Sequence, residues 1–266
     1  MINLSIIIPV GNYESDFRLV NQIKEKFKGC EIILVVDESN EFIIQEKIES
    51  DQLHLLRNSS RAKALNKGVD LSTRDILWFL HLDSDIENIN SSDLNSINKF
   101  ALTTFLLKFN EASCWWISAG ANIRTKAFSI PFGDQSFLIT KKLFNFIGPF
   151  NENLLEGEDH EFIWRIKSLN IKLDIINKHI VTSAKKYINN KIFQTLKTLS
   201  KTVSQTIKFR KQNKSVVLAT FLKDPKSNES KSRLRRELNN EFVNKLNKKF
   251  INITNQNLKR LNNKNK

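Results

Sequence analysis

The sequence predicts an α/β protein with a doubly wound, mostly parallel central sheet and helices on both of its faces. Two observations predict this class. Short apolar, β-branched runs alternate with segments of helical periodicity over the first third of the chain. The runs are apolar at consecutive positions, as in strands that are covered on both faces. With 266 residues the chain can hold one such domain and an appendage.

The first third of the chain supplies the alternation of strands and helices. The expected strands are at 4–9, 31–36, 53–56 and 76–81. The expected helices between them are at 16–28, at 41–49 and from Ser59 or Ser60 to about Leu71. Strands separated by helices in this order pair in parallel through right-handed crossovers.

The middle of the chain has a less regular pattern. Helices are expected at 91–109, at 141–146, where Gly148-Pro149 ends the helix, and from Glu158 onward. Further strands are expected at 116–123, 171–176 and 179–183, and a loop at 132–135 leads into Phe137–Ile139. We therefore place one domain at 1–187 and a basic helical extension at 188–266.

The extension carries a narrow apolar stripe on a basic helix at 191–211. Its members are Ile192, Leu196, Leu199, Val203 and Ile207. We favour packing of this stripe on the domain, where it would complete the core. The alternative is that the helix lies on the inner face of a membrane. Residues 224–266 are rich in Lys, Asn and Ser, which indicates a helix near 230–248 and a largely solvated end.

Composition limits the class of protein. The net charge of +14 is concentrated in the last part of the chain, which fits either attraction to anionic lipid or phosphate or a solvated basic tail. No apolar run is long enough for a membrane span, and the N-terminus reads as a strand and not as a signal peptide. Cys30 and Cys114 lie in unrelated contexts, so we expect no disulfide and a cytoplasmic location.

An acidic pair follows the fourth expected strand. The buried run Ile76–Leu80 leads into His81, Asp83 and Asp85, with the two carboxylates one residue apart. Open α/β sheets bind ligands at the carboxyl ends of their strands. Two carboxylates there suit Mg²⁺ or Mn²⁺ shared with a phosphate-bearing substrate. The alternative is a turn-forming Asp-Ser-Asp that caps the next element.

A second acidic group opens the helix that begins at Glu158. Asp159 shares one face with Ile163 and Ile166, so its carboxylate is expected on the buried side of the helix, toward a pocket. This makes Asp159 a candidate general base. Glu158 and Glu161 compete with it, although Glu161 pairs naturally with Arg165 at i, i+4. Acidic residues are also favoured at any helix N-terminus because of the helix dipole.

Several separated stretches, taken together, resemble one family. They are Ser5–Pro9, Glu31–Asp37, Ser60–Gly68, Phe79–Asp85, Gly133–Gln135, Glu158-Asp159 and Val181–Lys186. In order over residues 3–187, they resemble family 2 glycosyltransferases of the GT-A fold. The nearest subgroup is the "transferase 2" group found beside radical-SAM and selenium-related genes. After Asp37 this chain has Glu38-Ser39-Asn40, where that subgroup usually has glycines and a serine.

The resemblance implies an inverting, metal-dependent glycosyltransferase that uses a nucleotide-diphosphate sugar. It implies a nucleotide-binding half at about 1–86 and an acceptor half at about 87–187. Donor contacts would come from Pro9, Asp37, Arg61 and Asp83, and the metal ligands would be Asp83 and Asp85. The base would be Asp159, with Glu158 beside it, and the substrate pocket would include Asp134, Gln135 and Trp116. We expect the acids near 83 and 159 to face one cleft.

Two other functions remain open. A nucleotidyltransferase would need a Gly-rich basic loop after the first strand, but Pro9–Glu14 has one glycine and no basic residue. A sugar-nucleotide binding module without catalysis is conceivable because of the missing glycines after Asp37. Nucleic acid is not an expected partner, since the basic tail has few interleaved aromatic residues.

Overall fold

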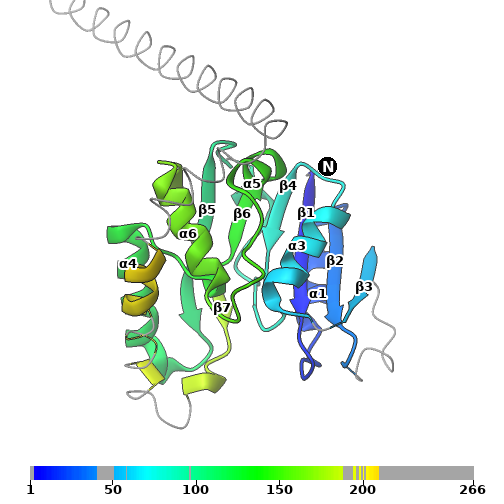
Figure 1. The fold of residues 1–266 in the computed structure, drawn as a ribbon. Helices are drawn as coiled ribbons and strands as arrows, with labels where there is room; N and C mark the ends of the chain where they lie inside the picture. The colour runs from blue at the N-terminus through cyan, green and yellow to red at the C-terminus, as the bar shows by residue number, and fades with distance from the viewer. Residues whose placement is uncertain are drawn as a thin grey trace, which may run out of the picture. The chain divides into compact units, whose positions relative to one another are not determined.

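The computed structural model contains a seven-stranded mixed sheet with the order β3-β2-β1-β4-β6-β5-β7 (Figure 1). It describes residues 3–40, 51–57, 59–95, 97–187, 194–195, 198, 200 and 202–209. All strand pairs are parallel except those made by β6, which runs antiparallel to both of its neighbours. The predicted α/β class with a mostly parallel sheet is therefore confirmed.

The first half of the domain forms as the apolar runs predict. The strands are β1 (Leu4–Val10), β2 (Glu31–Asp37), β3 (Gln52–Leu56) and β4 (Ile76–Phe79). The helices are α1 (Arg18–Lys26) and α3 (Arg61–Leu71). Ser60 is the N-cap of α3, and its hydroxyl accepts a hydrogen bond from the Lys63 backbone N–H. The helix predicted at 41–49 lies outside the described residues.

The helix predicted at 91–109 is wrong. A short 3-10 turn, η1 (Ser91–Leu94), precedes strand β5 (Ala101–Phe109), which lies between β6 and β7. Eight of the nine β5 residues are buried. An apolar run that is buried on both faces has no alternation, so its pattern cannot distinguish a strand from a buried helix.

The strand predicted at 116–123 is also wrong. After the 3-10 turn η2 (Ala112–Cys114), the chain forms helix α4 (Trp115–Phe128). Its buried residues are small and lie at helical spacing, at Ser118, Ala121 and Thr125, which lets the helix pack on β5. The two short strands predicted between 171 and 183 are one strand, β7 (Lys172–Thr182), whose pairing with β5 shifts register between Phe105 and Leu106.

The two remaining helices match their predictions, α5 (Lys141–Ile147) and α6 (Glu158–Ser168). The strand β6 (Phe137–Thr140) and the 3-10 turns η3 (Gly133–Gln135) and η4 (Lys185–Tyr187) were not predicted. Gly148 follows α5 with φ +93°, a left-handed conformation that glycine adopts without steric cost. The predicted i, i+4 pair is present, with Arg165 Nε 2.8 Å from Glu161 Oε1.

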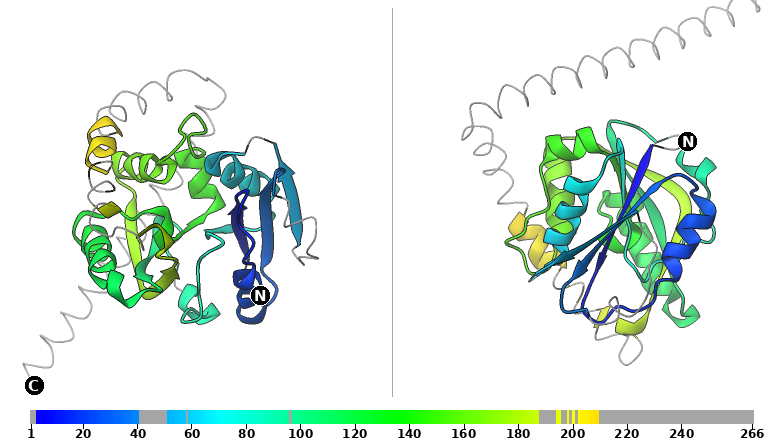
Figure 2. Two further views of the ribbon diagram at one scale, coloured as in Figure 1. Left: turned by 90° about the horizontal axis from the view of Figure 1, so that it is seen from below. Right: turned by 90° about the vertical axis from the view of Figure 1, so that its right-hand side faces the viewer.

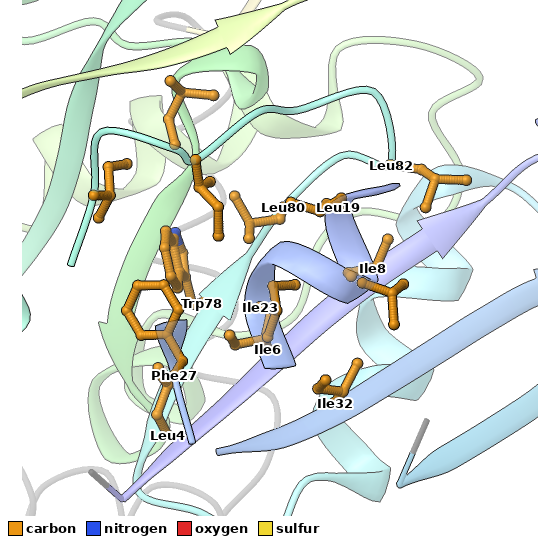
Figure 3. Close-up of a cluster of buried hydrophobic side chains, with 14 of the residues drawn as sticks. Leu4, Ile6, Ile8, Leu19, Ile23, Phe27, Ile32, Trp78, Leu80 and Leu82 are labelled. Atoms are coloured by element: carbon orange, nitrogen blue, oxygen red, sulfur yellow. The ribbon is translucent and has the colours of Figure 1, made fainter. Parts of the chain in front are cut away.

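Helices lie on both faces of the sheet (Figure 2, right-hand view), and a hydrophobic cluster lies on each face. Even-numbered β1 residues such as Ile6 and Ile8 pack with α1, whose Leu19 and Ile23 point at them beside Trp78 (Figure 3). Odd-numbered Ile7 packs on the other face with residues of α3, α5 and α6. This alternation explains why β1 is apolar at nearly every position.

The C-terminal segment, by which we mean the described residues of 194–209, is helical. The predicted packing of its apolar stripe is contradicted at the two described members, since Val203 is 58% exposed and Ile207 is 53% exposed. Phe209, which is outside the stripe, is buried. The rest of the predicted extension lies outside the described residues. Within the described part of the chain, no helix is long and apolar enough to cross a membrane.

Two helical glycines provide a test of the close packing between α3 and β1. A Cβ at Gly68 would overlap Cγ2 of the buried Ile7, whereas a Cβ at Gly120 of α4 would meet nothing within 4 Å. Gly68→Ala should therefore lower the free energy of unfolding by about 1–3 kcal/mol through overpacking. Gly120→Ala should raise it by about 0.5–1 kcal/mol because alanine is the better helix former. Urea denaturation measures both, and equal effects of the two changes would contradict this packing.

Candidate active site

The carboxyl ends of the parallel strands gather the candidate residues at one edge of the sheet. Asp37 is the last residue of β2, and Asp83 and Asp85 follow the end of β4. Because β6 is antiparallel, the η3 turn that precedes it lies at the same edge. This edge is where open α/β sheets bind ligands.

Asp37 is held by the turn that follows β2. Its Oδ1 accepts hydrogen bonds from the backbone N–H and the hydroxyl of Ser39, and its Oδ2 accepts one from the Ser59 backbone N–H. The Ser39 hydroxyl is the main cause that lowers the pKa of Asp37, against the opposing effect of burial. Pro9 is buried inside β1 opposite Val35 of β2, so it shapes this strand end and lines neither cavity described below.

Asp83 and Asp85 lie in a loop that is tied to the end of β7. Asp85 and Val181 form an antiparallel bridge, with backbone N–O distances of 2.7 and 3.1 Å. Asp83 is exposed, and its Oδ2 accepts a hydrogen bond from the Thr182 hydroxyl at 3.1 Å. Both aspartates line a cavity of about 550 Å³, together with Arg18 and Lys185.

The two aspartates differ in how much of each carboxylate is engaged. Asp85 Oδ1 accepts hydrogen bonds from the Gln22 amide at 3.0 Å and from the Glu87 backbone at 2.8 Å. The hydrogen bond from the Glu87 backbone is a turn contact, so Asp85 has in part the turn-forming role that the sequence left open. The described residues contain no group of three metal-binding side chains. Two neighbouring carboxylates nevertheless fit Mg²⁺ or Mn²⁺, which typically takes one or two carboxylates and completes its shell with water and substrate phosphates.

An ion pair joins the first half of the domain to α6. Arg61, at the first position of α3, donates from Nε to Glu158 Oε1, and its Nη2 lies 3.8 Å from Asp159 Oδ1. The Glu158 side chain is 2% exposed and that of Arg61 is 40% exposed. The arginine is thus engaged by α6 and faces the cavity beside Asp159, while Glu158 is its buried partner.

Asp159 is fixed by the backbone around it. Its Oδ2 accepts a hydrogen bond from the Gly133 N–H at 2.7 Å, and its Oδ1 accepts one from the His160 N–H at 2.8 Å. Burial raises the pKa of Asp159, but the charge of Arg61 and these two hydrogen bonds outweigh it, so the net pKa is lowered. Asp159 is therefore an ionised carboxylate at neutral pH, at the wall of a cavity of about 560 Å³.

The three predicted substrate residues have different surroundings. Asp134 is exposed and lines the cavity with Asp159. Gln135 is fully buried, and its amide bonds Thr125 at 2.8 Å and the Phe105 carbonyl at 3.1 Å, so its predicted place in the pocket is contradicted. Trp116 is exposed on the first turn of α4 and lines neither cavity. The Gly-Asp-Gln pattern in the sequence does not show that Asp134 is exposed while Gln135 is buried.

Asp83 and Asp159 line different cavities at this edge, and not one common cleft as the sequence predicted. Gly133 lies between the two groups. A Cβ added there would lie 3.0 Å from Asp159 Oδ2 and 3.1 Å from Nε2 of His81, two residues before Asp83. Gly133 therefore lies beside both Asp159 and His81.

The sequence did not predict the residues that complete the wall beside Asp159. His160 lines the cavity, and its Nδ1 lies 3.2 Å from Gln205 Oε1 of the C-terminal segment. A Cβ at Gly157 would collide with the same Gln205 amide. The available signal was the spacing of Gln194, Thr198, Thr202 and Gln205, which places polar residues on one helical face.

Comparisons with known proteins give a partial match to one family and a shared fold. Residues 5–94 match the family described as Glycosyl transferase family 2. The mannosyltransferase PcManGT from Pyrobaculum calidifontis, in complex with GDP-Man and Mn²⁺, is similar with a TM-score of 0.57 and 14% identity. The similarity covers 77% of this chain and 64% of PcManGT.

TarS (1–349) of S. aureus is similar with a TM-score of 0.50 and 14% identity, over 75% of this chain and 65% of TarS. This chain therefore spans slightly less than two thirds of both structures. No curated protein matches its sequence. The fold is that of GT-A glycosyltransferases, and the family 2 match includes Asp37, Arg61, Asp83 and Asp85. Both findings support the predicted glycosyltransferase class.

The Arg61–Glu158 pair should be important for stability. Arg61→Met leaves the Glu158 carboxylate buried without its partner, which should lower the free energy of unfolding by about 2 kcal/mol. This is less than for a fully buried pair because Arg61 is 40% exposed. The control is Arg57→Met, which breaks the exposed pair with Glu38 and should have no measurable effect on urea denaturation.

The interaction of Arg61 with Asp159 should also be visible in the pH dependence of stability. Because the pKa of Asp159 is lowered from its ordinary value of 3.8, its carboxylate stabilises the folded state at pH values above 3.8. This contribution is lost as the pH falls through the pKa of the folded state. Without Arg61 that pKa rises, so the contribution is smaller at neutral pH. The difference in stability between wild type and Arg61→Met should therefore narrow below about pH 4. A difference that is constant from pH 7 to pH 3 would contradict the interaction.

Proposed function

We propose that this protein is a glycosyltransferase that moves a sugar from a nucleotide-diphosphate donor to a hydroxyl acceptor. One observation carries the proposal: the ionised Asp159 faces a cavity at the sheet edge where Asp37 ends β2 and Asp83 follows β4. The family 2 match over residues 5–94 and the shared fold support it. The resemblance to the "transferase 2" subgroup is a further part of this proposal.

The donor diphosphate is proposed to bind at the cavity beside Asp83. Arg18 and Lys185 line this cavity and supply positive charge for phosphate. Asp37 and Pro9, at neighbouring strand ends, lie on the side where the nucleoside would contact the protein. The GDP-Man and Mn²⁺ bound to PcManGT support a nucleotide sugar and a divalent metal here.

Asp83 and Asp85 would hold Mg²⁺ or Mn²⁺. When bound, the ion would offset the negative charge that develops on the leaving diphosphate. The exposed carboxylate of Asp83 is the more available of the two, since Asp85 Oδ1 already accepts hydrogen bonds from Gln22 and Glu87. Thr182 orients Asp83 through its hydroxyl.

Asp159 is proposed to act as the general base. Its carboxylate takes the proton of the acceptor hydroxyl, whose oxygen forms a bond to the anomeric carbon as the bond to the diphosphate oxygen breaks. Attack from the face opposite the leaving group inverts the anomeric configuration. Arg61 and the Gly133 N–H hold Asp159 in its ionised form, so it can accept a proton at neutral pH.

The protein is proposed to work in the cytoplasm, where it contacts the inner face of a membrane through 191–211. Cys30 and Cys114 are both free, in agreement with a reducing compartment. The exposure of Val203 and Ile207 supports membrane contact, because an apolar stripe on a basic helix can lie in the bilayer interface. A lipid-linked acceptor would then be presented beside the catalytic edge.

The metal-binding role predicts a specific loss of donor binding. Asp83→Asn combined with Asp85→Asn should weaken calorimetric binding of GDP and UDP in the presence of Mn²⁺ by about tenfold or more. The control is Asp70→Asn, which removes a carboxylate charge from an exposed position of α3 and should leave the affinity unchanged. Unchanged Mn²⁺-dependent affinity in the double variant would refute the role of these aspartates.

The role of Asp159 predicts a loss of turnover without a loss of donor binding. Asp159→Asn should reduce transfer by about two orders of magnitude or more, because the amide cannot take a proton. The nucleotide affinity should stay within about twofold of wild type, since the nucleotide cavity does not include Asp159. If turnover survives, the base is another residue, with Glu158 the nearest carboxylate in the sequence.

A further inference from the structure

The outward face of helix α4 is apolar. Its exposed members lie at helical spacing and are Trp116, Gly120, Ile123 and Ala127. Trp115 and Phe128, at the two ends of the helix, are 70% and 62% exposed, and Ile123 is 64% exposed. Large exposed apolar side chains that gather on one element indicate an interaction surface. Trp115 and Trp116 line neither cavity at the catalytic edge, so the proposed sugar transfer gives them no role.

Polar side chains on the inner side of α4 hold the helix against β5. The Asn122 amide donates to the Leu107 carbonyl at 2.9 Å, and its oxygen accepts a hydrogen bond from the Leu107 N–H at 2.7 Å. The Thr125 hydroxyl lies 2.8 Å from Gln135 Oε1. The helix therefore turns hydrogen-bonding groups inward and most of its large apolar side chains outward, the reverse of an ordinary surface helix. Rotation of α4 about its axis would break these hydrogen bonds, so the apolar face stays outside.

The surroundings of this face are basic. The stretch Ala112–Gly133 contains Arg124 and Lys126 and no acidic residue. Lys126 is exposed, and so is Lys108 of β5. Both lysines lie near His179 of β7, whose pKa is lowered by burial and, in addition, by the charges of these two lysines. An apolar face beside positive charge is complementary to a surface that is both apolar and anionic.

An anionic lipid surface has both of these properties. Tryptophan and phenylalanine side chains favour the boundary between lipid headgroups and acyl chains. Lysines beside them attract anionic headgroups. A second copy of this chain is a poorer partner, because the net charge of +14 opposes self-association.

The start of α4 lies at the catalytic edge of the sheet. β6 is antiparallel to both β4 and β5, so β4 and β5 run in the same direction and end at the same edge. Trp115, the first residue of α4, follows β5 after the short turn η2 (Figure 1). A partner that contacts α4 at this end is therefore close to the catalytic edge.

We propose that the outward face of α4 is a docking surface for an anionic membrane. Trp115, Ile123 and Phe128 enter the lipid interface, and Lys108 and Lys126 contact the headgroups. The inference does not depend on glycosyl transfer, and it concerns a surface other than the stripe of 191–211.

The test measures co-sedimentation of the full chain with vesicles of phosphatidylcholine and phosphatidylserine in equal parts. Trp115→Ser, Ile123→Ser and Phe128→Ser combined should weaken binding by about tenfold or more, because three apolar side chains no longer leave water. Lys126→Gln should weaken binding by about fivefold. On vesicles of phosphatidylcholine alone, Lys126→Gln should bind as the wild type does, since these vesicles carry no net charge.

Two matched controls test whether the effects are specific to α4. Leu53→Ser combined with Leu55→Ser removes apolar side chains that are 42% and 49% exposed on β3, at the other end of the sheet from β7. Lys28→Gln removes one positive charge from an exposed position after α1. Both controls should bind vesicles as the wild type does.

Several outcomes would overturn the inference. The first is a wild type that does not bind the mixed vesicles, and the second is a triple α4 variant that binds them equally well. A lower urea midpoint of the triple variant, with unchanged binding of Lys126→Gln, would show that this face packs within the chain. A wild-type dimer in sedimentation that the triple variant dissociates would show that a second copy covers it.

The proposed contact through 191–211 is tested separately by Val203→Ser combined with Ile207→Ser. If this variant alone loses vesicle binding, the membrane contact belongs to 191–211 and the inference about α4 fails. Vesicle binding is measured without any nucleotide sugar, so the proposed glycosyl transfer can fail while the inference stands, and the reverse also holds.

Discussion

The ion pair between Arg61 and Glu158 is the interaction on which the site depends. It connects α3 with α6 across 97 positions of the sequence, at the point where both helices begin. The same arginine lowers the pKa of Asp159, so one guanidinium both joins the halves and keeps the candidate base ionised. Because Glu158 is buried, its charge is tolerated only with this partner.

A second connection joins the loop that contains Asp83 and Asp85 to the end of β7. The bridge between Asp85 and Val181 attaches the acidic loop to the end of β7, and the Thr182 hydroxyl orients Asp83. Both connections join residues that are about a hundred positions apart. The antiparallel β6 makes this possible, because it brings the η3 turn and Gly133 to the edge where the parallel strands end. Gly133 then donates its N–H to Asp159.

Local patterns predicted the first half of the fold well, and the reason is physical. The strands β1, β2 and β4 are short apolar runs, and helices with clear periodicity, α1 and α3, lie between strands in this part of the chain. The second half was less predictable because β5 is buried on both faces at all positions but one, and because α4 buries small residues. Asp83 and Asp159 could be singled out from their position at element ends. The separation of their cavities and the burial of Gln135 depend on tertiary packing, which spacing does not encode.

The C-terminal segment shows the limit of hydrophobic periodicity most clearly. An apolar stripe on a helix predicts burial of that stripe when the helix faces a core. Here the helix faces a cavity lined by Asp134, Asp159 and His160, and a cavity of this kind is matched by polar groups. Thr202 and Gln205 therefore point inward, while Val203 and Ile207 are exposed. The same reversal leaves Val203 and Ile207 as an apolar surface outside the cavity, and this surface is the one to which the proposed membrane contact through 191–211 is assigned.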